Sequence, residues 1–104
     1  MMPLPILIAA ALLTGGTAMA ADYEVSVAEY KFAPPELRIR AGDTVTWVNR
    51  EKRTSHSVLF NVTGEESERL FPDEKWTRAF PAAGRFEYHC GPHPEMTGVV
   101  VVED

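Results

Sequence analysis

Residues 85–102 read RFEYHCGPHPEMTGVVVV, and this stretch decides the fold class. From Arg85 to Cys90, polar and apolar side chains alternate. Successive side chains point to opposite faces of a strand, so this alternation predicts a strand with one buried face. The continuous apolar run from Gly98 to Val102 predicts a second strand, in the middle of a sandwich. The loop between the two strands is stiffened by Pro92 and Pro94.

The same strand signals recur toward the N-terminus, and helical periodicity is absent. Turn residues at Ala41-Gly42-Asp43 and at Pro81-Ala82-Ala83-Gly84 separate the alternating segments. Residues 61–75 are acidic and irregular, and they predict a solvated loop with a short strand near Leu70. The sequence therefore predicts an all-β, two-sheet sandwich of about seven strands. The remaining strands are expected at 22–27, 37–40, 44–49, 57–60 and 76–80.

Residues 1–20 differ from the rest of the chain, because they contain no charged side chain. Their apolar run, which ends in Ala18-Met19-Ala20, predicts a secretory signal peptide cleaved after Ala20, although no Lys or Arg precedes the run. The alternative is an uncleaved membrane anchor, since the apolar part approaches the lower length limit of a spanning helix. Residues 21–104 are then expected to form a single domain.

Charge and cysteine usage limit the possible functions of this exported domain. The net charge of −5 argues against nucleic acid and anionic membrane surfaces as partners, and it suits a basic protein partner. Cys90 is the only cysteine, so an internal disulfide is excluded. A lone thiol in an oxidising compartment needs an occupant, and a bound metal ion is a suitable one.

Three candidate metal ligands lie close together in the loop after the alternating strand. Cys90, His93 and Met96 bring a thiolate, an imidazole and a thioether, each separated from the next by two residues. Each residue alone could be a core or turn residue. Together, at this spacing and on a loop with fixed proline φ angles, they indicate a rigid metal site.

The second imidazole must come from elsewhere in the chain. His89 neighbours Cys90 in a strand and therefore points to the opposite face, so His56 is the better candidate. A thiolate, two imidazoles and a weak thioether are the ligands of type 1 blue copper, whereas Met is not a usual ligand of zinc. The sequence thus predicts one copper ion held by His56, Cys90, His93 and Met96.

The sequence resembles the cupredoxins over nearly the whole of residues 21–104. The resemblance is carried by the following motifs, in order: Phe32-Ala33-Pro34, Leu37 to Arg40, Gly42 to Asn49, Ser55 to Val58 and Tyr88 to Met96. Within this family of plastocyanin-like and amicyanin-like proteins, the short His93-to-Met96 spacing is similar to that of amicyanin. The resemblance implies a Greek-key β-sandwich with type 1 copper near one end.

The resemblance also implies a function and its partners. We expect a monomer in the bacterial periplasm that shuttles single electrons between redox proteins, such as a c-type cytochrome or a periplasmic dehydrogenase or oxidase. Electrons are expected to pass through His93. A copper carrier or chaperone is the alternative function. Enzymes with several copper centres need more than the three histidines present, so we expect no catalytic activity.

Three positions near the expected site depart from the amicyanin pattern. Ser55 stands where Pro is common, Ser57 where Asn ties the first His loop to the Cys loop, and Glu95 where Phe contributes to an apolar docking surface. Residues 21–30 also leave no room for the extra N-terminal strand of typical amicyanins. We expect Ser57 to make one fewer hydrogen bond near the Cys90 sulfur.

Overall fold

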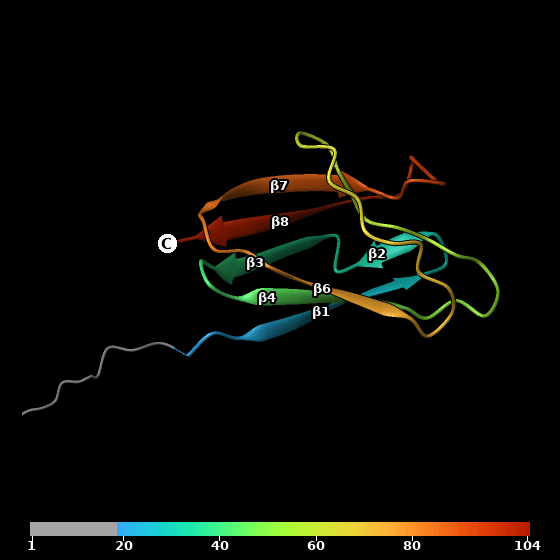
Figure 1. Cartoon of the computed structure of the whole chain (residues 1–104), viewed down its shortest axis with the longest axis horizontal. Helices are drawn as coiled ribbons and strands as arrows, with labels where there is room; N and C mark the ends of the chain where they lie inside the picture. Colours follow the sequence, from blue (N-terminus) through green and yellow to red (C-terminus); the bar gives the residue numbers. More distant parts are fainter. Residues whose placement is uncertain (1–18) are drawn as a thin grey trace, which may run out of the picture.

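The computed structural model describes residues 19–104, which form eight strands and no helix (Figure 1). Of the predicted signal peptide, residues 1–18 lie outside the described residues. The strands run as follows: β1 Asp22–Ala28, β2 Lys31–Ala33, β3 Glu36–Arg40, β4 Thr44–Asn49, β5 Leu59–Phe60, β6 Lys75–Ala79, β7 Gly84–His89 and β8 Thr97–Glu103.

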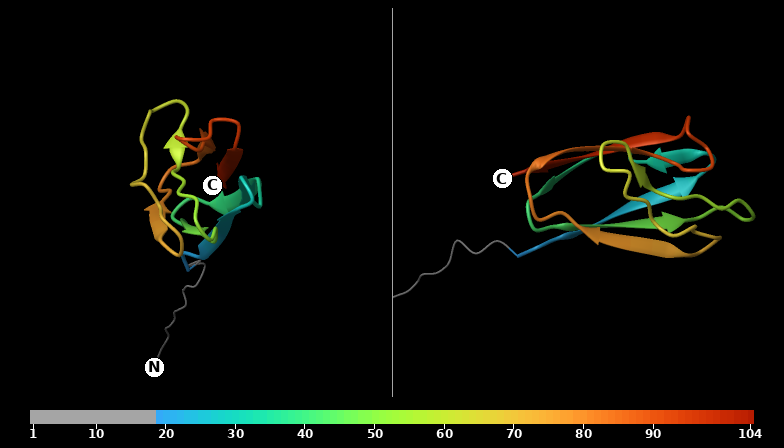
Figure 2. Two further views of the ribbon diagram at one scale, coloured as in Figure 1. Left: turned by 90° about the vertical axis from the view of Figure 1, so that its right-hand side faces the viewer. Right: turned by 45° about the horizontal axis from the view of Figure 1, so that its top comes forward.

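The strands build two sheets of four strands each, which face each other as a sandwich (Figure 2). One sheet has the order β2-β1-β4-β6 and the other has the order β3-β8-β7-β5. Strand β1 runs parallel to β4, and β3 runs parallel to β8, whereas the other pairs are antiparallel. The predicted all-β sandwich is confirmed.

Two strands differ from the sequence-based expectation. Strand β2 was not expected, because residues 31–33 are too few to display an alternating pattern. The strand expected at 57–60 is shorter and covers only Leu59–Phe60. His56 instead forms an isolated bridge with Leu70, where the sequence had indicated a short strand.

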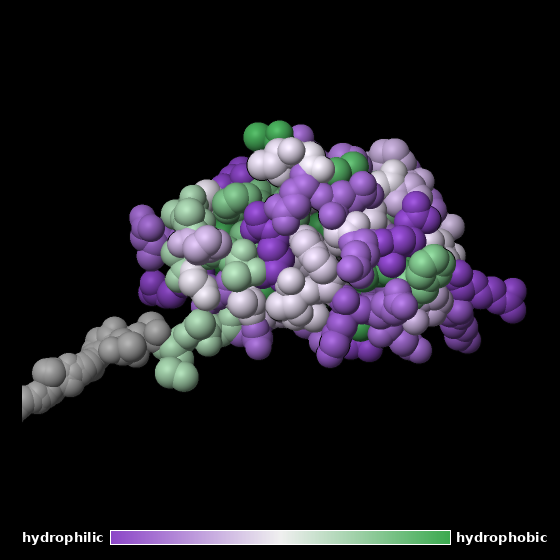
Figure 3. Space-filling view, in the orientation of Figure 1, coloured by the Kyte–Doolittle hydropathy of each residue, from purple (hydrophilic) through white to green (hydrophobic). Residues whose placement is uncertain are grey.

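The core lies between the sheets and is centred on Trp47, which is fully buried. Its ring contacts the rings of Phe60, Trp76, Phe80 and Tyr88, with centroid distances from 5.4 to 6.4 Å. Aromatic side chains each bury a large apolar area, so this cluster supplies much of the hydrophobic stabilisation. On the outside, the face seen in Figure 3 is mainly hydrophilic, with small separate hydrophobic patches.

A close approach between β7 and β8 fixes the strand pair that carries the Cys90 loop. Tyr88 pairs with Gly98, and a Cβ atom at Gly98 would collide with the Tyr88 hydroxyl group. Glycine is therefore required at position 98 for the ring to lie across the neighbouring strand. Burial raises the pKa of Tyr88 to about 12, which keeps the phenol neutral in the core.

The loops that matter for function gather at one end of the sandwich, the right-hand end of Figure 1. These are the β1–β2 turn, the segment after β4 and the β7–β8 loop, whereas the C-terminus lies at the other end. Among the described residues, no helix is long or apolar enough to cross a membrane.

Candidate metal centre

The β7–β8 loop is closed by its own backbone hydrogen bonds. The amide of Cys90 donates to the carbonyl of Met96 (3.0 Å), and the amide of Met96 donates to the carbonyl of His93 (2.9 Å). The amide of His93 donates back to the carbonyl of Cys90 (3.2 Å). These bonds hold the three residues in a compact turn, as the spacing and the two prolines had predicted.

His56 is held in place by Leu70, which lies within the acidic loop of residues 61–75. Its amide donates to the carbonyl of Leu70 (3.0 Å), and the amide of Leu70 donates to the carbonyl of His56 (2.7 Å). The side chain of His56 is fully buried. A residue far along the chain thus fixes the backbone of the second histidine, which no local sequence pattern reveals.

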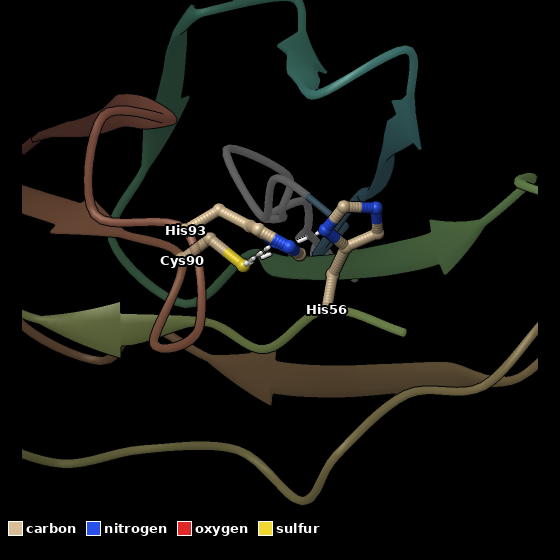
Figure 4. Close-up of side chains that lie close together, drawn as sticks. All are labelled: His56, Cys90 and His93. Atoms are coloured by element: carbon tan, nitrogen blue, oxygen red, sulfur yellow. Dashed lines mark hydrogen bonds between the residues drawn. The ribbon is translucent and has the colours of Figure 1, made fainter. Parts of the chain in front are cut away.

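Three ligand atoms converge at the end of the sandwich (Figure 4). The Cys90 Sγ atom lies 3.5 Å from Nδ1 of His56 and 3.5 Å from Nδ1 of His93. All three atoms lie within 4.8 Å of one another. Met96, which closes the same loop, is 3% exposed. The two 3.5 Å separations allow a metal ion to contact the sulfur and either nitrogen at bond lengths of about 2.0–2.3 Å.

The carboxylate of Glu51 orients the His56 ring. Its Oε2 lies 3.1 Å from Nε2 of His56, so Nε2 carries the proton and Nδ1 presents its lone pair toward Cys90. Burial lowers the pKa of His56, which favours the neutral ring. A neutral imidazole with a free Nδ1 is the form that a metal ion requires. Two such imidazoles, together with the Cys90 thiol and the Met96 thioether, are a set of donors that fits copper.

The surroundings of Cys90 control the charge of its sulfur. The thiol is fully buried, and burial raises the pKa of Cys90, although the Ser57 amide, which donates to Sγ at 3.4 Å, opposes this effect. The charge of Arg69 also lowers the pKa of Cys90, whereas that of Glu95 raises it. Metal binding to a thiol requires its deprotonation, so these groups influence metal affinity as well.

His93 is the most accessible of the four predicted ligands. It is half-buried, whereas His56, Cys90 and Met96 are buried. The ring of Tyr30 stands edge-on to His93, with centroids 4.8 Å apart, and also contacts His56 at 5.7 Å. Tyr30 is 50% exposed, so it forms part of the surface beside His93.

His89 lies away from the converging atoms, as its position in β7 predicted. Its Nδ1 lies 2.7 Å from Oδ1 of Asn61, and the side chain is half-buried. Sequence reasoning overlooked Tyr30 and Glu51, which contact the ligands from outside. An acidic residue five positions before His56 was the only available signal for Glu51.

Comparison with known proteins also indicates a copper-binding protein. A family model described as copper binding proteins, plastocyanin/azurin family, matches residues 19–103. The chain belongs to this family. The prediction of a copper-binding cupredoxin is therefore confirmed.

Several curated members of this family are similar in sequence. Amicyanin from Paracoccus denitrificans is 43% identical over 84 residues, which cover 76% of this chain and 63% of the relative. Amicyanin-alpha from Methylorubrum extorquens is 40% identical over 102 residues, which cover 93% of this chain and 85% of the relative. Plastocyanin from Scenedesmus fuscus is 33% identical and covers 69% of this chain and 86% of that protein. The predicted similarity to amicyanins is confirmed.

Solved structures agree with the sequence relatives. An oxidized amicyanin mutant is 36% identical and superposes with a TM-score of 0.74, covering 88% of this chain and 87% of that one. A Cu(I) form of another amicyanin mutant is 38% identical and gives the same TM-score, covering 79% of this chain and 82% of that one. The two-sheet sandwich is thus the cupredoxin fold.

Proposed function

We propose that this protein carries single electrons on one type 1 copper ion held by His56, Cys90, His93 and Met96. The observation that supports this most strongly is the convergence of a buried thiol and two imidazole Nδ1 atoms within 4.8 Å of one another. When bound, copper supplies a centre that alternates between Cu(I) and Cu(II) without making or breaking bonds in a substrate.

The chain contributes rigidity and a short path to the surface. The backbone bonds of the Cys90–Met96 loop hold the ligands in nearly one geometry. This favours electron transfer, because little reorganisation is then needed when the charge of the site changes. His93 is the half-buried ligand, so electrons enter and leave through its ring. The surface around it is apolar in part and includes Tyr30, Pro92 and Pro94, which are exposed.

The partners are redox proteins that dock briefly at this end of the sandwich. The net charge of −5 favours a basic partner such as a c-type cytochrome, and a dehydrogenase or an oxidase could occupy the other side of the pathway. We place the protein in the bacterial periplasm as a monomer formed by residues 21–104, with residues 1–20 removed as a signal peptide. No catalytic reaction is assigned to the site.

A copper carrier is the competing function. Carriers release their metal readily, and release needs accessible ligands. Here His56 and Cys90 are both fully buried and Met96 is 3% exposed, which favours retention of the metal. Electron transfer is therefore the better-supported function.

Stopped-flow mixing of the reduced copper protein with an oxidised basic c-type cytochrome tests the proposal. We expect bimolecular electron transfer whose rate falls as salt rises, because screening weakens the attraction between opposite charges. Quantitative copper transfer to an apo acceptor protein, without electron transfer to the cytochrome, would favour the carrier function instead.

A further inference from the structure

Ser57 links three parts of the site through one small side chain. It is 1% exposed and follows the ligand His56 directly. Its hydroxyl oxygen accepts a hydrogen bond from the amide of Gly91 (3.0 Å), the residue after Cys90. Its own amide donates to Cys90 Sγ (3.4 Å). Ser57 thus ties the two ligand segments together, a role that the resemblance to amicyanin assigns to Asn at this position.

The Ser57 hydroxyl group has a second partner, the carboxylate of Glu66. Ser57 Oγ donates to Glu66 Oε2 at 2.8 Å. The carboxylate lies directly against Gly91, where an added Cβ atom would collide with both Glu66 Oε2 and Ser57 Oγ. Glycine at position 91 therefore leaves the space that the carboxylate occupies.

The backbone around Glu66 keeps this carboxylate in place. Glu66 forms an isolated bridge with Leu59. The amide of the next residue, Ser67, donates to the carbonyl of Val58 (2.8 Å), and the hydroxyl oxygen of Ser67 accepts from the amide of Val58 (2.9 Å). The acidic loop is thus anchored beside the Cys90 loop at this point.

The hydrogen bonds from Gly91 to Ser57 and from Ser57 to Glu66 run in the same direction, so each strengthens the other. The Gly91 amide donates to Ser57, and Ser57 donates to the Glu66 carboxylate. A hydroxyl group that donates to a charged acceptor becomes more polarised, so its oxygen accepts more strongly. Glu66 therefore strengthens the bond that holds Gly91, although it contacts none of the proposed copper ligands through a hydrogen bond.

We propose that Glu66, acting through Ser57, is a positioning residue that holds the Cys90 loop in place and lowers the reduction potential of the copper site. Groups that surround the ligands set the reduction potential of a blue-copper site and orient its ligands. A negative charge beside the loop stabilises the more positive, oxidised site. The effect on the reduction potential rests on the proposed electron-transfer function. The positioning of the Cys90 loop does not, because the hydrogen bonds among Gly91, Ser57 and Glu66 form without a bound metal.

Hydrogen exchange of the Gly91 amide in the apo protein tests the positioning role. We expect Ser57→Ala to speed exchange about tenfold, as for loss of about 1.4 kcal/mol of hydrogen bonding. Glu66→Ala should also speed exchange, whereas Ser57→Thr, which keeps a hydroxyl group, should retain most of the protection. The matched control is Glu68→Ala, which removes another exposed acid from the same loop and should leave exchange unchanged.

A double-mutant cycle tests whether Glu66 acts through Ser57. Glu66→Ala should have no further effect on Gly91 exchange in the Ser57→Ala background, and an equal effect in both backgrounds would overturn the proposal. If Ser57→Ala does not fold, Glu66→Ala and Glu66→Gln decide the question in the wild-type background. Unchanged Gly91 exchange in both variants would then overturn the positioning role.

Voltammetry of the copper-loaded protein tests the redox part. Glu66→Gln, which is neutral and similar in shape, should raise the reduction potential, and Glu68→Gln should shift it less. Equal shifts in the two variants would overturn this part of the inference and leave the proposed function intact. A wild-type protein that binds no copper would contradict the proposed function instead, and Gly91 exchange in the apo protein would still decide the positioning role.

Discussion

The ring of Tyr30 stands nearly perpendicular to the ring of His93, with an interplanar angle of 85° and centroids 4.8 Å apart. Tyr30 also contacts His56 edge-on, at 5.7 Å. One half-exposed aromatic side chain therefore covers the edges of both candidate imidazole ligands. The β1–β2 turn, which carries Tyr30, is thus part of the metal centre, although it contributes no ligand.

Removal of this cover should accelerate loss of the metal. We expect Tyr30→Ala to speed copper release to a strong chelator by about two- to tenfold, because an aromatic pair contributes about 0.5–1.5 kcal/mol. Tyr30→Phe keeps the ring and should release copper at the wild-type rate. The release rate can be followed by absorption of the chelator complex. Equal rates in Tyr30→Ala and the wild type would show that the ring does not shield the site.

Glu51 should contribute to copper affinity through the His56 ring. Loss of a group that orients a metal-binding histidine typically lowers metal affinity about 10- to 100-fold, and we expect a loss of this size in Glu51→Ala. Competition titration against a chelator of known affinity measures it. Glu74→Ala changes an exposed acid elsewhere and serves as the control. An affinity equal to that of the wild type would exclude the orienting role of Glu51.

Asp43 should make the stability of the fold depend on pH. Its Oδ1 accepts from the backbone nitrogen of Ala21 (2.8 Å), which is the N-terminal ammonium group once residues 1–20 are removed. Its Oδ2 accepts from the Arg40 amide (2.9 Å), and these bonds lower the pKa of Asp43. Because the folded-state pKa is lowered, this stabilisation is complete above the unfolded-state pKa and is lost as pH falls through the folded-state pKa.

The prediction for Asp43 is checked by denaturant unfolding of the apo protein between neutral and acidic pH. Asp43→Asn should be less stable than the wild type at pH 7, and the difference should shrink as pH falls. A constant difference across this range would mean that ionisation of Asp43 does not contribute to the stability of the fold.

Trp47 should be the core residue whose truncation costs most. It is fully buried among four aromatic rings, and replacing a buried aromatic residue by Ala typically costs about 3–5 kcal/mol. We expect Trp47→Ala to lower the free energy of unfolding of the apo protein by this amount in urea. The half-buried Trp76 offers a comparison, because Trp76→Ala should cost less. An equal loss of unfolding free energy in Trp47→Ala and Trp76→Ala would show that Trp47 is not the centre of the core.

The parts of the site that depend on local spacing could be predicted from the sequence. Cys90, His93 and Met96 lie on one tight loop, so their separation in sequence is sufficient to group them. His56 required elimination of His89, which rests on the alternation of strand side chains. The alternating segments likewise predicted most strands, because one face of each is buried.

The surrounding contacts could not be predicted, because they depend on how distant segments pack together. Ser57 and Glu66 meet only because the acidic loop folds back along residues 58–59. The expectation that Ser57 makes one fewer hydrogen bond near the Cys90 sulfur than Asn did not include the bond from Ser57 to this carboxylate. Tyr30 reaches His93 across the end of the sandwich, so no sequence period connects them.

The central claim, a type 1 copper site with a Cys90 thiolate ligand, is tested most directly by visible absorption after copper loading. We expect the purified apo protein to bind one equivalent of Cu(II) and to develop an intense blue colour from charge transfer between the thiolate and the metal. Reduction should abolish the colour, and Cys90→Ser should never develop it. A folded wild-type protein that stays colourless with Cu(II) bound would contradict the account.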